Sequence, residues 1–370
     1  MLTTSTDELD ELRAVVRAFL SEKSTIADVR RLAATTEGYD RNVWQRLTRQ
    51  LRLPALAVPS RYGGDGFGVR EQLVVLEEMG AALLGAPYLA TVLATTALLA
   101  GDDEEARQDL LPRIVDGAIV TLAVAEEDSG WGVASVQTTA TRVGDAFVLD
   151  GRKVEVLDGH VADILLVAAR AEGGVSLFAV DGRHPVRQQA DGADRTRRWA
   201  RVDFAATPAR LIGGTGDAAD AVDAARRRGV LAVAAEQTGG ARRCLELSVE
   251  YAKRRHQFGQ PIGTFQAIRH RCADMLLEVE SAAAAVRWAA EVHEDRALSW
   301  YAAHLAKACC SEAYSRVSAE CLQVHGSVGF VTESPVPWHL VRAGASELLF
   351  GRPDEHLGAA ARHVVDGTQA

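Results

Sequence analysis

Three side chains in the C-terminal half of the chain combine a cation, an amide and an aromatic ring: Arg255, Gln257 and Phe258. A guanidinium bonds two oxygens of a phosphate or carboxylate at once, and an amide adds a neutral donor beside it. The three side chains therefore suit an anionic, planar ligand edge. A helix hairpin with solvated arginines would contain the same residue types, so the types alone leave both interpretations open.

Two helices should position this group, because the apolar residues on both sides of it recur with helical spacing. Gly259, Pro261 and Gly263 lie between these segments and cannot continue a helix, which predicts a turn. We expect the Thr264 hydroxyl to cap the second helix by accepting from its first free N–H groups.

The rest of the chain predicts a multi-domain α+β protein of 370 residues. Residues 1–118 show helical periodicity and form an N-terminal helical domain. Residues 119–213 contain short apolar runs bounded by Gly and Asp, which predict a β domain of about six strands. These runs are 120–125, 135–143, 146–149, 164–169, 175–180 and 201–204. Residues 214–370 are helical again, in four or five long helices.

Three motifs resemble those of one family. The order Arg-x-Gln-Phe-Gly-x-Pro-Ile-Gly-x-Phe-Gln-x-Ile over residues 255–268 resembles a signature of the acyl-CoA dehydrogenases. Residues 323–330, QVHGSVGF, resemble the second C-terminal signature of that family, and residues 62–68, YGGDGFG, resemble its N-terminal loop. The resemblance covers essentially the whole chain. It implies a helical domain, a central β-barrel-like domain and a C-terminal four-helix bundle, with FAD between the subunits of a dimer or tetramer.

The family's catalytic base is missing at both places where relatives carry it. Family members remove the α-proton of an acyl-CoA with a glutamate, usually in a Tyr-Glu-Gly-Thr stretch after the second signature. The matching position here is Phe350, which cannot accept a proton. Some relatives place the base on the helix before the first signature, and that position is Gly229. Glu236 is a weaker candidate for a relocated base; its other interpretation is a helix-face carboxylate paired with Arg242 or Arg243.

The resemblance also locates two hydroxyls that hold the flavin ring in the family and are absent here. The family's Thr-Glu-Pro-x-x-Gly-Ser segment matches residues 125–131, where Ala125 replaces the threonine and Trp131 replaces the serine. The next strand's Trp-Ile-Thr matches residues 155–157, so Leu157 replaces a second threonine. Trp131 could also fill space that pantetheine needs. The flavin pocket of this chain therefore looks disabled.

The groups that the chain would lend to a neighbouring subunit remain. The resemblance implies that Arg255, Gln257 and Phe258 contact the FAD bound there, and that three apolar residues line the same site, namely Ile262, Phe265 and Ile268. Gln323, Gly326 and Ser327 should touch the pyrophosphate and ribose, with Ser327 in place of the family's second glycine. At the helix end, His325 is expected to cap or pack rather than to titrate.

Composition excludes several other classes. A net charge of −9 argues against nucleic-acid binding. The acidic N-terminus lacks a signal peptide's basic and apolar regions, and no apolar run is long enough to span a membrane, so we expect a cytoplasmic protein. The five cysteines lie in predicted helices without CxxC spacing, which predicts reduced thiols and no metal site.

These observations lead to three hypotheses. In the first, the chain is the base-less subunit of a heterotetrameric acyl-CoA dehydrogenase, whose sibling chain carries the glutamate and the flavin-gripping threonines. It would then resemble the degenerate subunit of two-gene enzymes of steroid side-chain β-oxidation, with acyl-CoA as substrate and electron-transferring flavoprotein as the usual acceptor. In the second, it is an active homo-oligomer with a relocated base. In the third, it is a flavin-free binding or scaffold protein.

Overall fold

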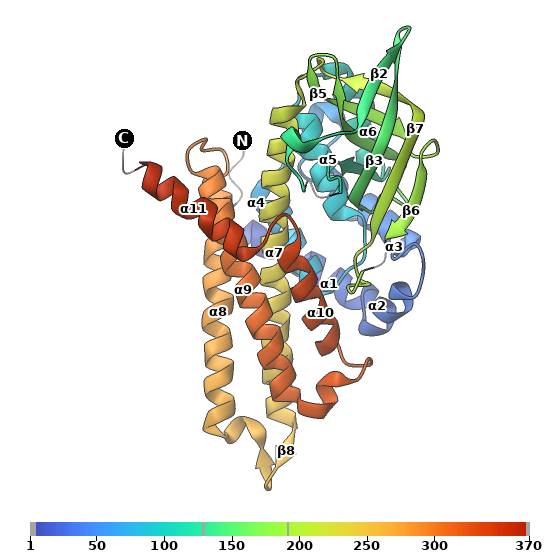
Figure 1. The fold of residues 1–370 in the computed structure, drawn as a ribbon. Helices are drawn as coiled ribbons and strands as arrows, with labels where there is room; N and C mark the ends of the chain where they lie inside the picture. The colour runs from blue at the N-terminus through green and yellow to red at the C-terminus, as the bar shows by residue number, and fades with distance from the viewer. Residues whose placement is uncertain (1–4, 128–129, 191, 368–370) are drawn as a thin grey trace. The chain divides into compact units, whose positions relative to one another are not determined.

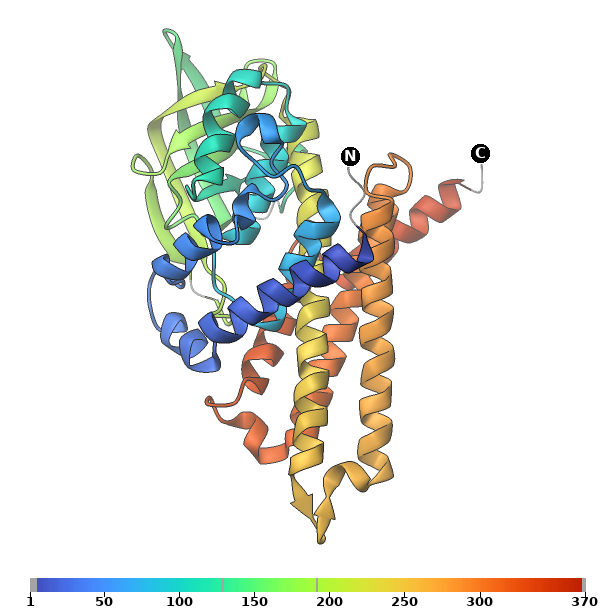
Figure 2. The ribbon, with the colours of Figure 1, turned by 180° about the vertical axis from the view of Figure 1, so that it is seen from behind.

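The computed structural model describes residues 5–127, 130–190 and 192–367 (Figures 1 and 2). These residues fall into two compact units. The first unit contains Leu32–Gly68 and Gly85–Gly229, and the second contains residues 5–31, Val69–Leu84 and 230–367. The boundary at Gly229 lies inside one long helix, α7 (Ala218–Arg254), which begins in the first unit and continues in the second.

The first unit is built on a β-barrel. In the described part of the chain its strands are β1 (Val120–Ala123), β2 (Thr139–Val143), β3 (Ala146–Leu157), β4 (Ile164–Ala171), β5 (Gly174–Asp181), β6 (Val186–Ala190) and β7 (Trp199–Ile212). The sheet runs β4-β2-β3-β7-β5, and β5 pairs again with β4, so these five strands close on themselves. The remaining two, β1 and β6, pair with β4 and β7 from outside this ring. This is the β-barrel-like domain that the sequence predicts.

Several details of the strand prediction differ from the structure. The runs at 146–149 and 201–204 are parts of the longer strands β3 and β7. The run at 135–143 is a strand only from Thr139, because Val133–Ser135 form a 3-10 turn before it. Strand β6 has the sequence VRQQA, which lacks the apolar alternation that marks a strand. These residues nevertheless form a strand, because all five pair with β7 in an antiparallel ladder from Val186↔Asp203 to Ala190↔Trp199.

The helices of the first unit pack beside this barrel: α3 (Arg41–Arg49), α5 (Tyr88–Ala100) and α6 (Glu104–Val115). Asp103 caps α6, since its carboxylate accepts from the Ala106 N–H at 2.9 Å. The glycine-rich loop at 62–68 is held by its own contacts. Tyr62 donates to Glu104 at 2.7 Å, and Arg52 pairs with Asp65 at 2.9 Å. The loop is therefore a structural feature of this unit.

The second unit is a four-helix bundle of α7, α8 (Gln266–Glu291), α9 (Ser299–His325) and α10 (Val336–Leu348). All four helices contribute to one hydrophobic core. Its buried residues are Ala241, Cys244 and Leu247 from α7, Met275 and Val279 from α8, Tyr314, Val317 and Cys321 from α9, and Val336 and Ala343 from α10. A last helix, α11 (Pro353–Gly367), packs on α9. The predicted bundle is confirmed.

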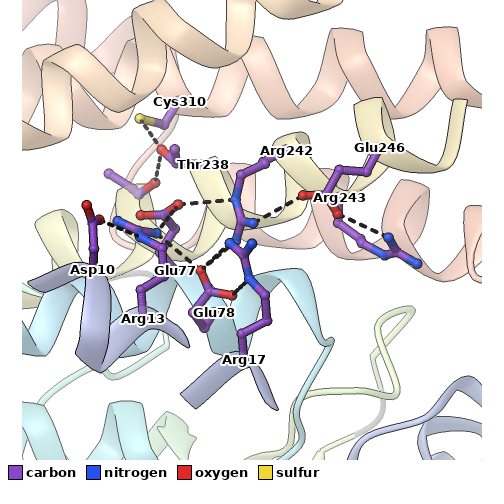
Figure 3. A network of polar contacts seen from close by, with 11 residues as sticks. Asp10, Arg13, Arg17, Glu77, Glu78, Thr238, Arg242, Arg243, Glu246 and Cys310 are labelled. Atoms are coloured by element: carbon purple, nitrogen blue, oxygen red, sulfur yellow. Dashed lines mark hydrogen bonds and ion pairs between the residues drawn. The ribbon is translucent and has the colours of Figure 1, made fainter. Parts of the chain in front are cut away.

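Two N-terminal helices, α1 (Thr6–Lys23) and α4 (Val69–Ala81), belong to this second unit. They are tied to α7 by a polar network (Figure 3). Its centre is Glu78 on α4, whose side chain is 2% exposed. Arg13 and Arg17 reach it from α1 at 3.1 and 2.9 Å, and Arg242 reaches it from α7 at 2.7 Å.

The expected cap of α8 is wrong. The helix begins at Gln266 after Phe265, without a side-chain cap. Instead, the Thr264 hydroxyl donates to the Pro261 carbonyl at 2.7 Å, because a short 3-10 turn over Ile262–Thr264 already occupies this position. The five cysteines are free thiols, and each lies in a helix as predicted. Within the described ranges, no helix is both long and apolar enough to cross a membrane.

Candidate cofactor-binding end of the helical bundle

The turn between α7 and α8 is a tight β-hairpin at one end of this helix pair (Figures 1 and 2). Its strands β8 (His256–Gln257) and β9 (Gln260–Pro261) pair in register. The two residues between them, Phe258 and Gly259, both have positive φ, at 53° and 77°. A two-residue loop with this geometry is a type I′ turn, which normally requires Gly, Asn or Asp at both positions.

Phe258 therefore adopts a backbone conformation that bulky residues avoid, and its side chain is 91% exposed. Its ring meets Phe265 edge-on, with ring centroids 6.1 Å apart. Ile262, Phe265 and Ile268 are half-buried behind the hairpin. An exposed aromatic ring held in a strained turn is a feature of contact surfaces, where strain is retained for function.

The second predicted group lies where α9 ends, at His325. Gln323, Gly326 and Ser327 are all exposed there, and a short 3-10 turn (Gly326–Phe330) follows. The ring of His325 stacks on Tyr251 of α7, with centroids 4.4 Å apart and planes 27° apart. Tyr251 O accepts from the Arg255 N–H at 2.8 Å. The structure thus brings the two groups of candidate residues to the same end of the bundle.

The polar side chains of both groups are available to a ligand. Arg255, Gln257, Gln323 and Ser327 are exposed, and none makes a side-chain hydrogen bond or ion pair within the described residues. The neighbouring Arg254, in contrast, contacts the carbonyl and the carboxylate of Glu250. One unpaired guanidinium, two amides and a hydroxyl form a donor set that fits the phosphates and ribose of an anionic dinucleotide.

The turn that carries Phe350 lies elsewhere in the same unit. Phe350 is buried, 9% exposed, and has φ 63°. Beneath the turn, Lys307 of α9 is fully buried, and its ammonium donates to the Ser311 hydroxyl at 2.9 Å and to the Glu347 carbonyl at 3.0 Å. Burial lowers the pKa of Lys307 to about 8. This turn therefore carries an apolar ring at position 350 in place of a carboxylate, and the buried Lys307 ammonium holds the backbone beneath it.

In the first unit, the residues that the sequence match aligns with the family's two flavin-binding threonines are fully buried. Ala125 and Leu157 are each 1% exposed, and Trp131 is 9% exposed. None of the three side chains carries a hydroxyl, so they do not fit the flavin edge that threonines would hold. Asp128 and Ser129, in the same matched segment, lie outside the described residues.

The segment that matches the family's flavin-binding stretch has a buried anchor at Glu126. This buried carboxylate accepts from the Lys153 ammonium at 2.6 Å and from the Thr138 hydroxyl at 2.7 Å. Lys153 is 0% exposed and also donates to the Val124 carbonyl at 2.9 Å. Although burial alone raises the pKa of Glu126, these hydrogen bonds outweigh it and lower that pKa.

The predicted pairing of Glu236 is wrong. Arg242 pairs with Glu77, Glu78 and Glu246, and Arg243 pairs with Glu246 and Glu250. Glu236 is buried on α7, and its carboxylate lies 4.0 Å from Arg342 of α10. The helical spacing from 236 to 242 and 243 is six and seven residues, which places their side chains nearly two turns apart. A long-range partner on another helix was not visible from that spacing.

The sequence interpretation missed several residues that support these sites: Lys307, Lys153 and Tyr251. Lysine is rare in this chain, and Lys307 sits alone in an otherwise Ala-rich helix segment, AHLAKACC. A charged residue in such a segment signals either an exposed face or a buried partner, and only the fold distinguishes the two.

Comparisons with known proteins cover nearly the whole chain. The acyl-CoA dehydrogenase N-terminal, middle and C-terminal domains match residues 6–118, 121–206 and 220–365. IpdE2 of Mycolicibacterium smegmatis (strain ATCC 700084 / mc(2)155), an acyl-CoA dehydrogenase, is 34% identical over 95% of this chain and 97% of its own length.

Two solved structures are similar at 28% identity and a TM-score of 0.87. One is a Tcur3481–Tcur3483 steroid ACAD, with 98% of this chain and 99% of that chain covered. The other is the ChsE4–ChsE5 complex from Mycobacterium tuberculosis, with 99% of both chains covered. Sequence, domain order and fold agree, and the chain belongs to the FAD-dependent acyl-CoA dehydrogenase family.

Proposed function

We propose that this chain is the base-less subunit of a heteromeric acyl-CoA dehydrogenase. A partner subunit carries the catalytic glutamate and most of the FAD site, and this chain lends Arg255, Gln257 and Phe258 across the subunit seam. The observation that carries the proposal is a contrast within one molecule. The donor set at the hairpin is exposed and unpaired, while the positions of the base and of the flavin-binding hydroxyls hold Phe350, Ala125 and Leu157.

Each lent residue has a separate task. Arg255 places a positive charge against the phosphates, and Gln257 adds a neutral hydrogen-bond donor two residues on. Phe258 covers the cofactor edge and excludes water, and Ile262, Phe265 and Ile268 form the apolar wall behind it. Gln323, Gly326 and Ser327 complete the contacts to ribose and phosphate. Bound FAD supplies the hydride acceptor for α,β-desaturation, and the α-proton is removed by the partner's side of the site.

The substrate class proposed is a bulky acyl-CoA thioester. Two of the similar solved structures are described as a steroid ACAD and as a two-component complex, which supports a heteromeric assembly here. One working pocket shared by two chains leaves room for a large acyl group. Electron-transferring flavoprotein, the usual acceptor in the family, is the proposed electron acceptor.

The proposal is tested by expressing the chain alone and together with an acyl-CoA dehydrogenase chain that carries the glutamate. Alone, the chain should be colourless or retain little FAD, and it should not reduce a dye with acyl-CoA. Together, the two should co-purify with flavin. A yellow, active homo-oligomer would support a relocated base instead. If the two chains form a complex but the partner binds the same amount of flavin without this chain, the chain is a scaffold.

A further inference from the structure

His325 is held in one orientation at the end of α9 that carries Gln323, Gly326 and Ser327. Its Nδ1 lies 2.8 Å from the Cys321 carbonyl oxygen and 3.7 Å from the Cys321 sulfur. A carbonyl oxygen only accepts hydrogen bonds, so Nδ1 carries a proton. The other ring nitrogen, Nε2, has no hydrogen-bond partner in the part of the chain that the structure describes. It is therefore the atom that gains or loses a proton.

Three features of this place favour the protonated ring. The carbonyl bond at Nδ1 stabilises the imidazolium more than the neutral ring. His325 is the last residue of α9, where the helix dipole favours a positive charge. Its face lies against the Tyr251 ring at 4.4 Å, which suits a cation. Burial alone lowers the pKa of His325, but the hydrogen bonds to Cys321 outweigh burial and raise that pKa above 6.5.

On its Nδ1 side the ring has one titratable partner, the Cys321 thiol. Tyr251 of α7 stacks on the ring, and the Cys321 thiol of α9 lies 3.7 Å from Nδ1. Hydrogen bonds from Cys244 and from His325 lower the pKa of Cys321 to about 5, so an anionic group lies on the Nδ1 side of the ring. Cys244 on α7 and Cys272 on α8 interact with Cys321, and the turn at Gly326–Phe330 contributes no titratable group. Among the described residues no carboxylate is bonded to His325. The Nε2 side of the ring, in contrast, has no bonded partner among the described residues. This side of a half-buried cation, beside the exposed candidate residues, suits an anionic ligand group.

We propose that His325 is a proton-dependent cationic contact for the phosphates of the dinucleotide, so that the lent half-site binds FAD more tightly when His325 is protonated. The inference rests on the proposed function and adds a residue that the sequence interpretation assigned to capping or packing. His325 does pack, against Tyr251, and that packing is what aims and holds the ring. Arg255 supplies a permanent charge to the same end of the bundle, and His325 supplies one that depends on pH.

The test uses the heteromeric complex and measures the FAD dissociation constant by flavin fluorescence, at constant ionic strength, from about pH 6 to about pH 8.5. Wild-type affinity should fall about tenfold across this range, because the protonated ring is lost as pH rises through its pKa. His325→Gln should bind weakly at every pH with a flattened profile. His325→Arg should bind tightly at every pH, which separates charge from packing. His184→Gln, an exposed histidine in the β-barrel unit, should keep the wild-type profile.

Arg255→Ala in the same assay separates this inference from the proposed function. If Arg255→Ala weakens FAD binding but His325→Gln keeps the wild-type pH profile, the half-site stands and the role of His325 is wrong. If neither substitution changes FAD binding, the lent half-site itself is wrong. A flattened profile in His325→Gln together with tight, pH-independent binding in His325→Arg supports the inference.

Discussion

At the scale of single residues, Phe350 bears most directly on whether this chain can remove a proton from a substrate. The motif match places it where family members carry the base, and it is buried on a turn with positive φ. A phenyl ring cannot take a proton, whatever the rest of the pocket does. The same is true of the methyl group of Ala125 and the isobutyl group of Leu157, which cannot donate the hydrogen bonds that threonine hydroxyls make.

Phe350→Glu should leave the isolated chain inactive. The substitution restores a carboxylate but not the two missing hydroxyls, so the flavin still lacks its contacts in this chain. The measurement is dye reduction with an acyl-CoA, with circular dichroism to show that the variant is folded. Phe350→Gln is the matched control, since it has the same shape without the charge. Turnover in the glutamate variant and none in the glutamine variant would show that the pocket is otherwise intact.

Lys153→Met should destabilise the protein by about 3–5 kcal/mol, because it leaves the buried carboxylate of Glu126 without its cation. The Thr138 hydroxyl and two backbone N–H groups would remain as its donors. Urea unfolding followed by circular dichroism gives the free energy of unfolding. The neighbouring Arg152→Met, which removes an exposed pair with Asp203, should change it little. Equal effects of the two substitutions would contradict a buried anchor.

At the scale of elements, the helical and strand patterns predicted the helical and β regions and most strand positions, and the family resemblance implied the barrel and the four-helix bundle. The patterns succeeded where an apolar face repeats, as in α6, which lies within the predicted helical region 1–118. They missed β6, which is polar and depends on its pairing with β7, and they assigned Thr264 to a helix cap that a 3-10 turn prevents.

The sequence supplied the candidate residues of the site but not how they lie relative to one another. The motif order located Arg255 and Gln323 on separate stretches, and only the fold shows the stack of Tyr251 on His325 that brings these stretches together. The sequence likewise could not predict which residues pair with the buried charges. Glu236 lies near Arg342, over a hundred positions away in sequence, and such a contact leaves no local spacing to detect.

The polar network that joins α1, α4 and α7 makes a prediction at this scale (Figure 3). Glu78→Gln should destabilise the protein by about 3 kcal/mol, because Arg13, Arg17 and Arg242 would face one another around a neutral amide. Thermal unfolding measures the effect. Glu246→Gln, which removes a half-exposed partner of Arg242, should cost about 1 kcal/mol or less.

The same network fixes the sign of its pH dependence. Burial alone raises the pKa of Glu78, but hydrogen bonds from Arg17 and Arg242 outweigh it and hold that pKa below 4.5. The folded state therefore binds this proton less tightly than the unfolded state does. The stability from Glu78 is fully present above pH 4.5 and is lost as pH falls through the lowered pKa. The difference in melting temperature between wild type and Glu78→Gln should shrink over that acidic range, and a constant difference would contradict the network.

At the scale of the whole molecule, the proposed function requires a partner subunit to complete the catalytic site. Several large apolar side chains on the bundle unit remain exposed, including Phe258 at 91%, Leu277 at 68% and Phe330 at 68%. Phe258 and Phe330 belong to the hairpin and to the turn after α9, the segments of the proposed half-site. Exposed aromatic rings beside unpaired donors indicate a surface that is covered when a partner binds.

The most direct test of this central claim is the flavin content of the heteromeric complex after gel filtration, with Arg255→Ala compared with wild type and with oligomer size recorded in the same run. Loss of the charge-assisted contact to phosphate should weaken FAD binding about 10- to 150-fold. Arg255→Lys should restore it only in part, because an ammonium cannot bond two oxygens as a planar fork. Arg254→Ala is the matched control, since that side chain is already engaged by Glu250. The account predicts a complex of unchanged size that has lost flavin only in the Arg255 variants, and wild-type flavin content in Arg255→Ala would contradict it.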